Sequence, residues 1–215
     1  MTGKSLQTMP VAADVSNDEE VALMVRQVVD HYGTIDILVN AAAVQIYPGK
    51  EISELEPKEW DFVLNIGLKA AYLCTRHAAP VFKSKGSGKI VNVASIAGHR
   101  GSPGGSAYTA AKGGVITLTR QMAVELGPHR INVNSVSPGF TPNRLTTVYE
   151  YQAMIGGTDE PPALSIGTVE SSGPPLGRKG TVGDFVGPVL FLASHWADFI
   201  TGVDLPVEGG RLAAR

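Results

Sequence analysis

A tyrosine and a lysine stand four residues apart in the segment Tyr108-Thr-Ala-Ala-Lys112. In an α-helix this spacing places the phenol and the ammonium group on one face, close to each other. A nearby positive charge favours the phenolate, so it lowers the tyrosine pKa from its reference value of about 10 towards the range useful for proton transfer. The pair alone is a weak signal, because chance gives a Tyr-x-x-x-Lys in roughly one such sequence in four. The neighbouring segments must therefore decide whether the pair is functional.

A serine lies at the end of a predicted strand shortly before this pair. The segment Lys89-Ile-Val-Asn-Val-Ala-Ser95 has the apolar character of a buried strand, and Gly98 follows it in a turn. Ligands of α/β proteins bind at the carboxyl ends of strands. An isolated serine there would most often only cap or turn the chain. Its position before Tyr108 and Lys112 favours a functional interpretation.

The elements that would position these residues alternate between helical and strand-like patterns. Four segments have helical periodicity: residues 21–32, 59–82, 106–126 and 181–194. Ser16 and Glu19 have the spacing of a capping box for the first of these helices. Five segments are mostly apolar on both faces, as buried parallel strands are: Gln7–Ala13, Ile35–Asn40, Lys89–Ala94, Arg130–Val136 and Asp204–Val207. The alternation predicts an α/β fold, a Rossmann-like doubly wound parallel sheet with helices on both faces.

Composition limits the class of protein. The chain has 215 residues, 43% hydrophobic and 18% charged, with a formal net charge of −2, which fits one globular domain over residues 1–215. Without a basic cluster, neither nucleic acid nor an anionic membrane is expected as the main partner. No apolar run reaches the length of about 18 residues that a membrane span needs. Cys74 is the only cysteine and no histidine has metal-ligand spacing, so we expect a cytoplasmic location and no metal site.

These segments resemble the short-chain dehydrogenase/reductase superfamily, and the resemblance runs from about Leu6 to Gly210. The order and spacing of several motifs carry the resemblance, although any one of them is weak. They are Asp14-Val15, Asn40-Ala-Ala-Ala43, Val63-Leu-Asn-Ile-Gly67, Ser95 with Tyr108 and Lys112, Ser137-Pro-Gly-Phe-Thr-Pro-Asn143, and Ile200-Thr-Gly-Val-Asp-Leu-Pro-Val-Glu-Gly-Gly210.

The resemblance implies hydride transfer between NAD or NADP and a small alcohol or carbonyl substrate. Tyr108 would be the acid in reduction and the base in oxidation, while Ser95 would bind the substrate oxygen. Lys112 would hold the nicotinamide ribose and lower the pKa of Tyr108. Asn65 would hold a water that links Lys112 to solvent. These four residues form the implied catalytic set.

The resemblance also implies which residues contact the dinucleotide. The pair after the first predicted strand would contact the adenine, and the Pro-Gly pair would lie beside the nicotinamide. Ala41 and Ala43 replace the family's usual asparagine and glycine, and Asn143 stands where the family often has threonine. The full implied set is Asp14, Val15, Asn40, Ala42, Tyr108, Lys112, Pro138 and Gly139.

The largest departure from the family pattern concerns the phosphate-binding turn. No Thr-Gly-x-x-x-Gly-x-Gly occurs in the sequence, which begins at what corresponds to the family's third strand. Because that turn and the following helix N-terminus hold the pyrophosphate, we expect a Rossmann-type domain truncated at its N-terminus, with weak dinucleotide affinity. With the first two strands absent, Gln7–Ala13 is expected to pair directly with Ile35–Asn40.

Substrate and assembly are less closely defined by the sequence. Residues 143–177 are predicted to form a substrate-side lid loop. Between Leu145 and Gly177 there are acidic residues and neither Lys nor Arg, which weakly disfavours an acyl carrier as partner. The helices over 59–82 and 106–126 carry small and apolar residues on several faces, so we expect a homodimer or homotetramer. Two functions remain open: an NAD(P)-dependent oxidoreductase impaired by truncation, or a non-catalytic oligomerising remnant without dinucleotide binding.

Overall fold

The fold was analysed in a computed structural model of the chain. It describes residues 7–45, 50–101, 103–141 and 173–214. The predicted lid loop over residues 143–177 therefore lies almost wholly outside the described residues.

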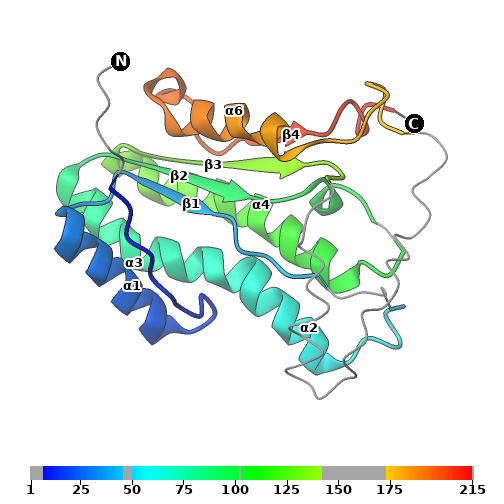
Figure 1. The fold of residues 1–215 in the computed structure, drawn as a ribbon, viewed down its shortest axis with the longest axis horizontal. Helices are drawn as coiled ribbons and strands as arrows, with labels where there is room; N and C mark the ends of the chain where they lie inside the picture. The colour runs from blue at the N-terminus through cyan, green and yellow to red at the C-terminus, as the bar shows by residue number, and fades with distance from the viewer. Residues whose placement is uncertain (1–6, 46–49, 102, 142–172, 215) are drawn as a thin grey trace.

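Four parallel strands form the central sheet, in the order in which they occur along the chain. Figure 1 shows α1 (Asp18–Tyr32), α3 (Ala70–Lys85) and α4 (Ser106–Leu126) on one face of this sheet and α6 (Val182–Ala193) on the other. This arrangement confirms the predicted Rossmann-like α/β fold, and it confirms four of the five predicted strands. The strands are β1 (Ile37–Asn40), β2 (Gly88–Val93), β3 (Ile131–Pro138) and β4 (Asp204–Val207).

The predicted first strand is wrong. Residues 7–13 belong to no strand, and the expected direct pairing with β1 is absent from the ladders of the described chain. Pro10 lies in the middle of this segment, and its ring nitrogen cannot donate a hydrogen bond to a neighbouring strand. The carbonyl of Gln7 instead accepts a hydrogen bond from the Tyr32 hydroxyl on α1, at 3.3 Å.

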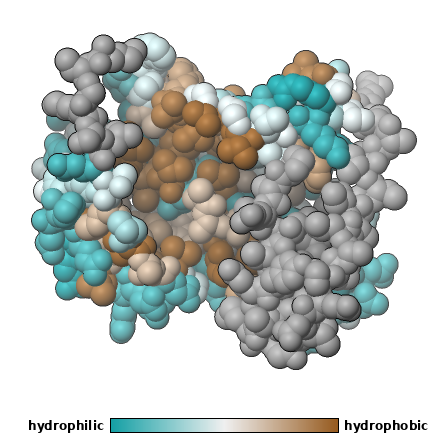
Figure 2. All heavy atoms as spheres, viewed as in Figure 1, coloured by the Kyte–Doolittle hydropathy of each residue, from teal (hydrophilic) through white to brown (hydrophobic). Residues whose placement is uncertain are grey.

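As a result β1 is an edge strand of the described sheet. Leu38 packs against the cluster that contains Phe82, so the alternation of side chains puts Ile37 and Val39 on the opposite face. Ile37 is 48% exposed and Val39 is 43% exposed. Figure 2 shows an apolar area over α6 and β1 on this side of the molecule. Strand β1 is thus apolar on both faces, and along one of its edges no neighbouring strand of the described residues pairs with its backbone.

The first helix, α1 (Asp18–Tyr32), begins one residue later than the predicted cap requires. The side chain of Asn17 accepts hydrogen bonds from the backbone N–H groups of Glu19 and Glu20, at 3.0 and 3.3 Å. The predicted capping box of Ser16 and Glu19 is therefore wrong. Asparagine caps a helix as well as serine does. Because Asn17 directly precedes the first helical residue, Asn17 occupies the cap position and Ser16 does not.

The long helix predicted over residues 59–82 is interrupted in its middle. It consists of α2 (Pro57–Leu64), a π-helical turn η1 (Asn65–Lys69) and α3 (Ala70–Lys85). In the π turn the N–H of Ala70 bonds to the carbonyl of Asn65 five residues earlier. Such turns contain one extra residue and often mark functional sites. Here the extra residue falls at a predicted catalytic position.

The remaining helices match their predicted positions closely. They are α4 (Ser106–Leu126) and α6 (Val182–Ala193), with short 3-10 turns η2 (Ile96–Gly98), η3 (Gly127–His129) and η4 (His195–Ala197). The main core lies between α3, α4 and the sheet, and a second cluster lies under α6. Among the described residues, no helix combines the length and the apolar character needed to cross a membrane.

Candidate active site

The structure brings three of the predicted catalytic residues together beside the carboxyl end of β2. Ser95 follows this strand at the start of η2, and Tyr108 and Lys112 lie on the first two turns of α4. The Lys112 Nζ atom lies 2.7 Å from the carbonyl oxygen of Val93 and 5.8 Å from the centre of the Tyr108 ring. The predicted spacing on one helix face is thus observed.

The fourth predicted residue, Asn65, lies on a turn that packs closely against the same helix. A Cβ atom at Gly67 would lie 3.1 Å from the Cβ of Ala111, and one at Gly114 would lie 2.7 Å from a methyl group of Leu68. The π turn therefore approaches α4 at the residue next to Lys112. In the described part of the chain the side-chain amide of Asn65 has no hydrogen-bond partner. Its amide is thus available to a ligand or a water.

Lys112 is a buried cation. Its exposed fraction is only 2%, and its ammonium group donates to a backbone carbonyl, not to a carboxylate. Removal from water disfavours the charged form, so burial lowers the pKa of Lys112 to about 8. Lysines with pKa values near neutrality are common in functional sites, because their charge can change during a reaction.

This lysine is expected to make stability depend on pH. Its pKa is about 8 in the folded chain and 10.5 when unperturbed, so between these values the unfolded chain binds more protons. The free energy of unfolding should therefore rise as the pH increases through this window, and the rise should be missing in Lys112→Met. Urea unfolding of both proteins at several pH values measures the difference. The exposed Lys83→Met is the control, and equal slopes in wild type and Lys112→Met would contradict the prediction.

Ser95 is oriented by the turn that follows it. Its Oγ atom accepts a hydrogen bond from the N–H of Ala97 at 3.1 Å, and its extended backbone caps η2. A hydroxyl has one donor and two acceptor positions, so this contact leaves its hydrogen able to donate. Ser95 can therefore offer a hydrogen bond to an oxygen atom of a ligand.

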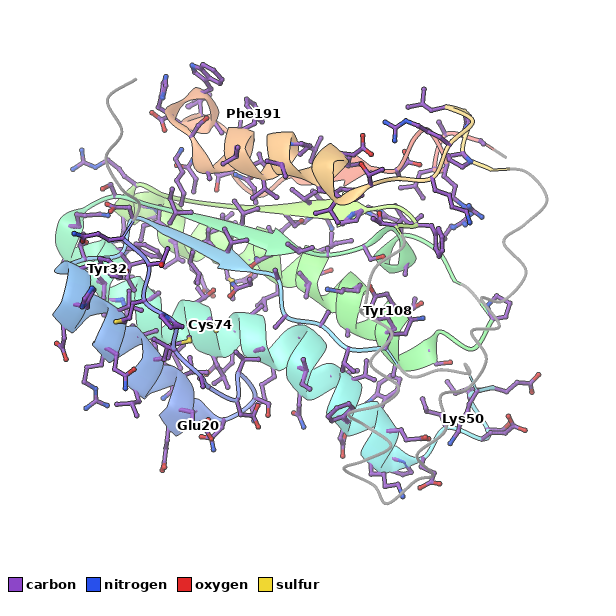
Figure 3. All side chains as sticks on the ribbon, in the orientation of Figure 1. Glu20, Tyr32, Lys50, Cys74, Tyr108 and Phe191 are labelled. Carbon is purple, nitrogen blue, oxygen red and sulfur yellow. The ribbon has the colours of Figure 1, made fainter. Side chains whose placement is uncertain are left out.

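Tyr108 lies at the boundary between the core and the surface. Its ring packs on the apolar cluster that includes Val63 and Ala111, and it borders a cavity of about 10 Å³. Lys50 borders the same cavity and forms an ion pair with the buried Glu59 at 2.6 Å. Figure 3 shows Tyr108 and Lys50 at the same end of the molecule, beyond the carboxyl ends of the strands.

One buried asparagine that contacts a predicted site residue was not identified from the sequence. Asn92 on β2 is fully buried; it accepts a hydrogen bond from the Asn40 side chain at 2.8 Å and donates one to Thr119 at 2.9 Å. The feature of the sequence that could have indicated Asn92 is a polar residue within the apolar strand predicted from Lys89 to Ala94. The side chain of Asn40, a predicted cofactor residue, therefore braces β1 against β2 and α4.

Ala42 is another predicted cofactor residue; it follows β1 and is exposed. Pro138 and Gly139 lie at the carboxyl end of β3, where the N–H of Gly139 donates to the carbonyl of Val207 at 2.9 Å. A Cβ atom at Gly139 would lie 2.8 Å from the Cα of Glu208, so only glycine fits there. A cavity of about 330 Å³ opens beside these strand ends.

The predicted adenine pair lies away from the other site residues. The Asp14 carboxylate accepts hydrogen bonds from the hydroxyl and the N–H of Ser16, and these bonds lower its pKa. Its own N–H bonds to Glu20, which Figure 3 shows well apart from Tyr108. Val15 packs into a small apolar cluster between α1 and α3. The described contacts therefore do not join this pair to the residues on α4.

Comparison with known proteins identifies the family. A family model described as enoyl-(acyl carrier protein) reductase matches residues 2–211. The 3-oxoacyl-[acyl-carrier-protein] reductase FabG of Staphylococcus aureus (strain Mu50 / ATCC 700699) is 34% identical over 207 residues, which cover 96% of this chain and 78% of that protein.

Solved structures give the same result. A putative short-chain alcohol dehydrogenase from Sinorhizobium meliloti 1021 has a TM-score of 0.80 at 30% identity, over 95% of this chain and 76% of that one. A gluconate 5-dehydrogenase from Burkholderia cenocepacia J2315, in complex with NADP and tartrate, has a TM-score of 0.78 at 26% identity, over 94% and 74%. The chain belongs to the short-chain dehydrogenase/reductase family. It is an oxidoreductase of the class that acts on CH–OH and C=O groups.

Proposed function

We propose that this chain interconverts a small alcohol and its carbonyl compound with NAD or NADP, using Tyr108 as the proton donor and acceptor. The observation that carries the proposal is the buried ammonium of Lys112, 5.8 Å from the centre of the Tyr108 ring and next to the strand end that bears Ser95. An acid, a hydrogen-bond donor and a cation at one strand end are the groups that carbonyl reduction needs.

Each residue of the set has a role that its surroundings support. Tyr108 gives its phenolic proton to the carbonyl oxygen in reduction and takes it back in oxidation. Ser95 donates its free hydroxyl hydrogen to the same oxygen, where negative charge develops. Lys112 stabilises the phenolate by its charge, and Asn65 holds a water through which the proton lost from the site is replaced.

The residues present suit the nicotinamide end of a dinucleotide, which supplies or accepts the hydride when bound. The Lys112 ammonium has three N–H groups, and one of them bonds to Val93, so donors remain for ribose hydroxyls. We propose that the backbone after Asn40, including Ala42, and the Pro138-Gly139 pair bound this end. Asp14 and Val15 are proposed for the adenine end.

We expect weak dinucleotide binding by this chain. Its 215 residues contain no Gly-x-x-x-Gly-x-Gly turn, so the pyrophosphate would lack the ring of backbone N–H groups that such a turn supplies. Calorimetric titration of the full chain with NADH and NADPH measures this directly. A dissociation constant in the low micromolar range would contradict the expectation.

The function itself is tested by turnover at dinucleotide concentrations high enough to compensate for weak binding. We expect slow loss of the reduced dinucleotide's absorbance with at least one carbonyl probe from a panel containing an acetoacetyl thioester, a keto-sugar acid and a cyclic ketone. The first two probes follow the names of the reductase and dehydrogenase relatives. No turnover with any probe at saturating dinucleotide would favour the alternative, a non-catalytic oligomerising remnant.

We further propose that the chain forms a homodimer or homotetramer through α2, α3 and α4. On these helices Tyr72 is 44% exposed and Val124 is 74% exposed, although both are apolar or aromatic. Such side chains are favoured in subunit interfaces. Static light scattering that gives a monomer at tens of micromolar would count against this assembly.

A further inference from the structure

The turn that carries Ser95 is joined to β4, at the edge of the sheet opposite β1, by a hydrogen bond between two side chains. The His99 Nε2 atom lies 2.7 Å from an oxygen of the Asp204 carboxylate, at the start of β4. The other oxygen of this carboxylate accepts hydrogen bonds from the hydroxyls of Ser135 and Ser137 on β3, at 2.5 and 2.9 Å. The Asp204 side chain is only 4% exposed.

This carboxylate has little freedom to move. Three donors from two segments fix its two oxygens, and a buried carboxylate that loses a donor is left with an unsatisfied charge. The Asp204 side chain on β4 is therefore held in a fixed position by the hydrogen bonds from β3. The imidazole of His99 is attached to this carboxylate, with its side chain 28% exposed.

His99 is connected rigidly to Ser95. The N–H of His99 bonds to the carbonyl of Ile96 at 3.0 Å, and the N–H of Gly98 bonds to the carbonyl of Ser95 at 2.9 Å. With the contact from Ala97 to the Ser95 hydroxyl, these bonds close one tight turn. A shift of the imidazole must therefore move the backbone that orients the Ser95 hydroxyl.

The opposite side of the turn rests on α4. A Cβ atom at Gly98 would lie 2.8 Å from the backbone of Lys112 and Gly113. The turn is thus held at two points, by backbone contact with α4 at Gly98 and by the hydrogen bond from His99 to Asp204 on β4. Contact with α4 alone would allow the turn to pivot about Gly98, whereas the second attachment prevents this.

We propose that His99, through Asp204, is a positioning residue that holds the Ser95 hydroxyl in register with Tyr108. Its catalytic consequence rests on the function proposed above, but its effect on the turn does not. The chain provides a matched control in His77, whose Nε2 atom also lies 2.7 Å from a carboxylate, that of Asp18 on α1. That pair links α3 to α1, outside the turn.

The first test measures the turn without any ligand. Hydrogen exchange of backbone amides in the full chain is followed in wild type, His99→Ala, His99→Gln and His77→Ala. We expect the amides of residues 97–99 to exchange about tenfold faster in His99→Ala, as loss of one ordinary hydrogen bond predicts. His99→Gln, which can still donate to Asp204, should restore most of the protection. Unchanged exchange in His99→Ala, or an equal increase in His77→Ala, would overturn the proposal.

The second test measures the consequence for catalysis. If wild type turns over a carbonyl probe, His99→Ala should lower kcat by about 10- to 100-fold, as expected for misplacement of a reacting group by about 1 Å. The KM for the probe should stay within about threefold, and His99→Gln should recover kcat. A wild type without turnover refutes the proposed function, whereas the exchange result decides the attachment of the turn separately. A kcat equal to wild type in a loosened His99→Ala turn would overturn the positioning role.

Discussion

Replacement of Tyr108 by phenylalanine should lower turnover by about 10²- to 10⁴-fold, the usual contribution of a positioned proton donor. The substitution removes one hydroxyl and keeps the ring, which packs on the cluster around Val63 and Ala111. Folding and dinucleotide affinity should therefore stay close to wild type. Steady-state rates with a carbonyl probe, together with calorimetric titration of the dinucleotide, measure the two quantities separately.

A second tyrosine provides the control for this experiment. Tyr32 lies on α1 and is 39% exposed, and Tyr32→Phe removes the same hydroxyl outside the site and outside the proposed subunit interface. Its turnover should equal that of wild type. If Tyr108→Phe keeps turnover within tenfold of wild type, Tyr108 is not the proton donor, and the hydroxyl of Ser95 or a bound water would have to take that role.

Gly98→Ala is expected to have the other large effect. The new Cβ atom would meet the backbone nitrogen of Gly113 and the carbonyl carbon of Lys112, both at 2.8 Å, and backbone atoms cannot turn aside as a flexible side chain can. The turn must move away from α4, and Ser95 moves with it. We expect turnover to fall by about 100-fold and the free energy of unfolding to fall by about 1–3 kcal/mol.

The glycine three residues further on makes the comparison informative. Among the residues that the structure describes, none would lie within 4 Å of a Cβ atom at Gly101, so Gly101→Ala changes the same residue type without a close contact. Kinetics and urea unfolding of this variant should match those of wild type. Equal losses in both variants would mean that backbone freedom in the whole segment matters, and not the close approach of Gly98 to α4.

Local patterns in the sequence predicted the parts of the fold that depend on local physics. The helix over residues 106–126 was predicted with the bounds it has, because its periodicity ends at Gly127-Pro128. The segment Gln7–Ala13 has the composition of a strand, but a strand exists only where a neighbour accepts its hydrogen bonds, and composition does not encode the neighbour. The π turn at Asn65 depends on the close packing of Gly67 on Ala111, a contact between residues far apart in the chain.

The same distinction separates the predicted and the missed parts of the candidate site. Tyr108 and Lys112 are four residues apart, so helical geometry alone brings them together. The pair of Asn40 and Asn92 spans 52 residues, and the pair of His99 and Asp204 spans 105. The sequence contains the chemistry of these residues but not their contacts, which follow only from the register of the strands.

The π turn also limits how the length of its helix can change during evolution. Each residue of an α-helix rotates the next by about 100° around the axis. The extra residue in η1 (Asn65–Lys69) therefore sets which side chains of α3 face the sheet, including the fully buried Ala78 and Phe82. An insertion or deletion of one residue between α2 and α3 would turn that buried face towards α1 or solvent. In homologous sequences that need a gap at this point, the helix equivalent to α3 should therefore pack on the sheet through different residues.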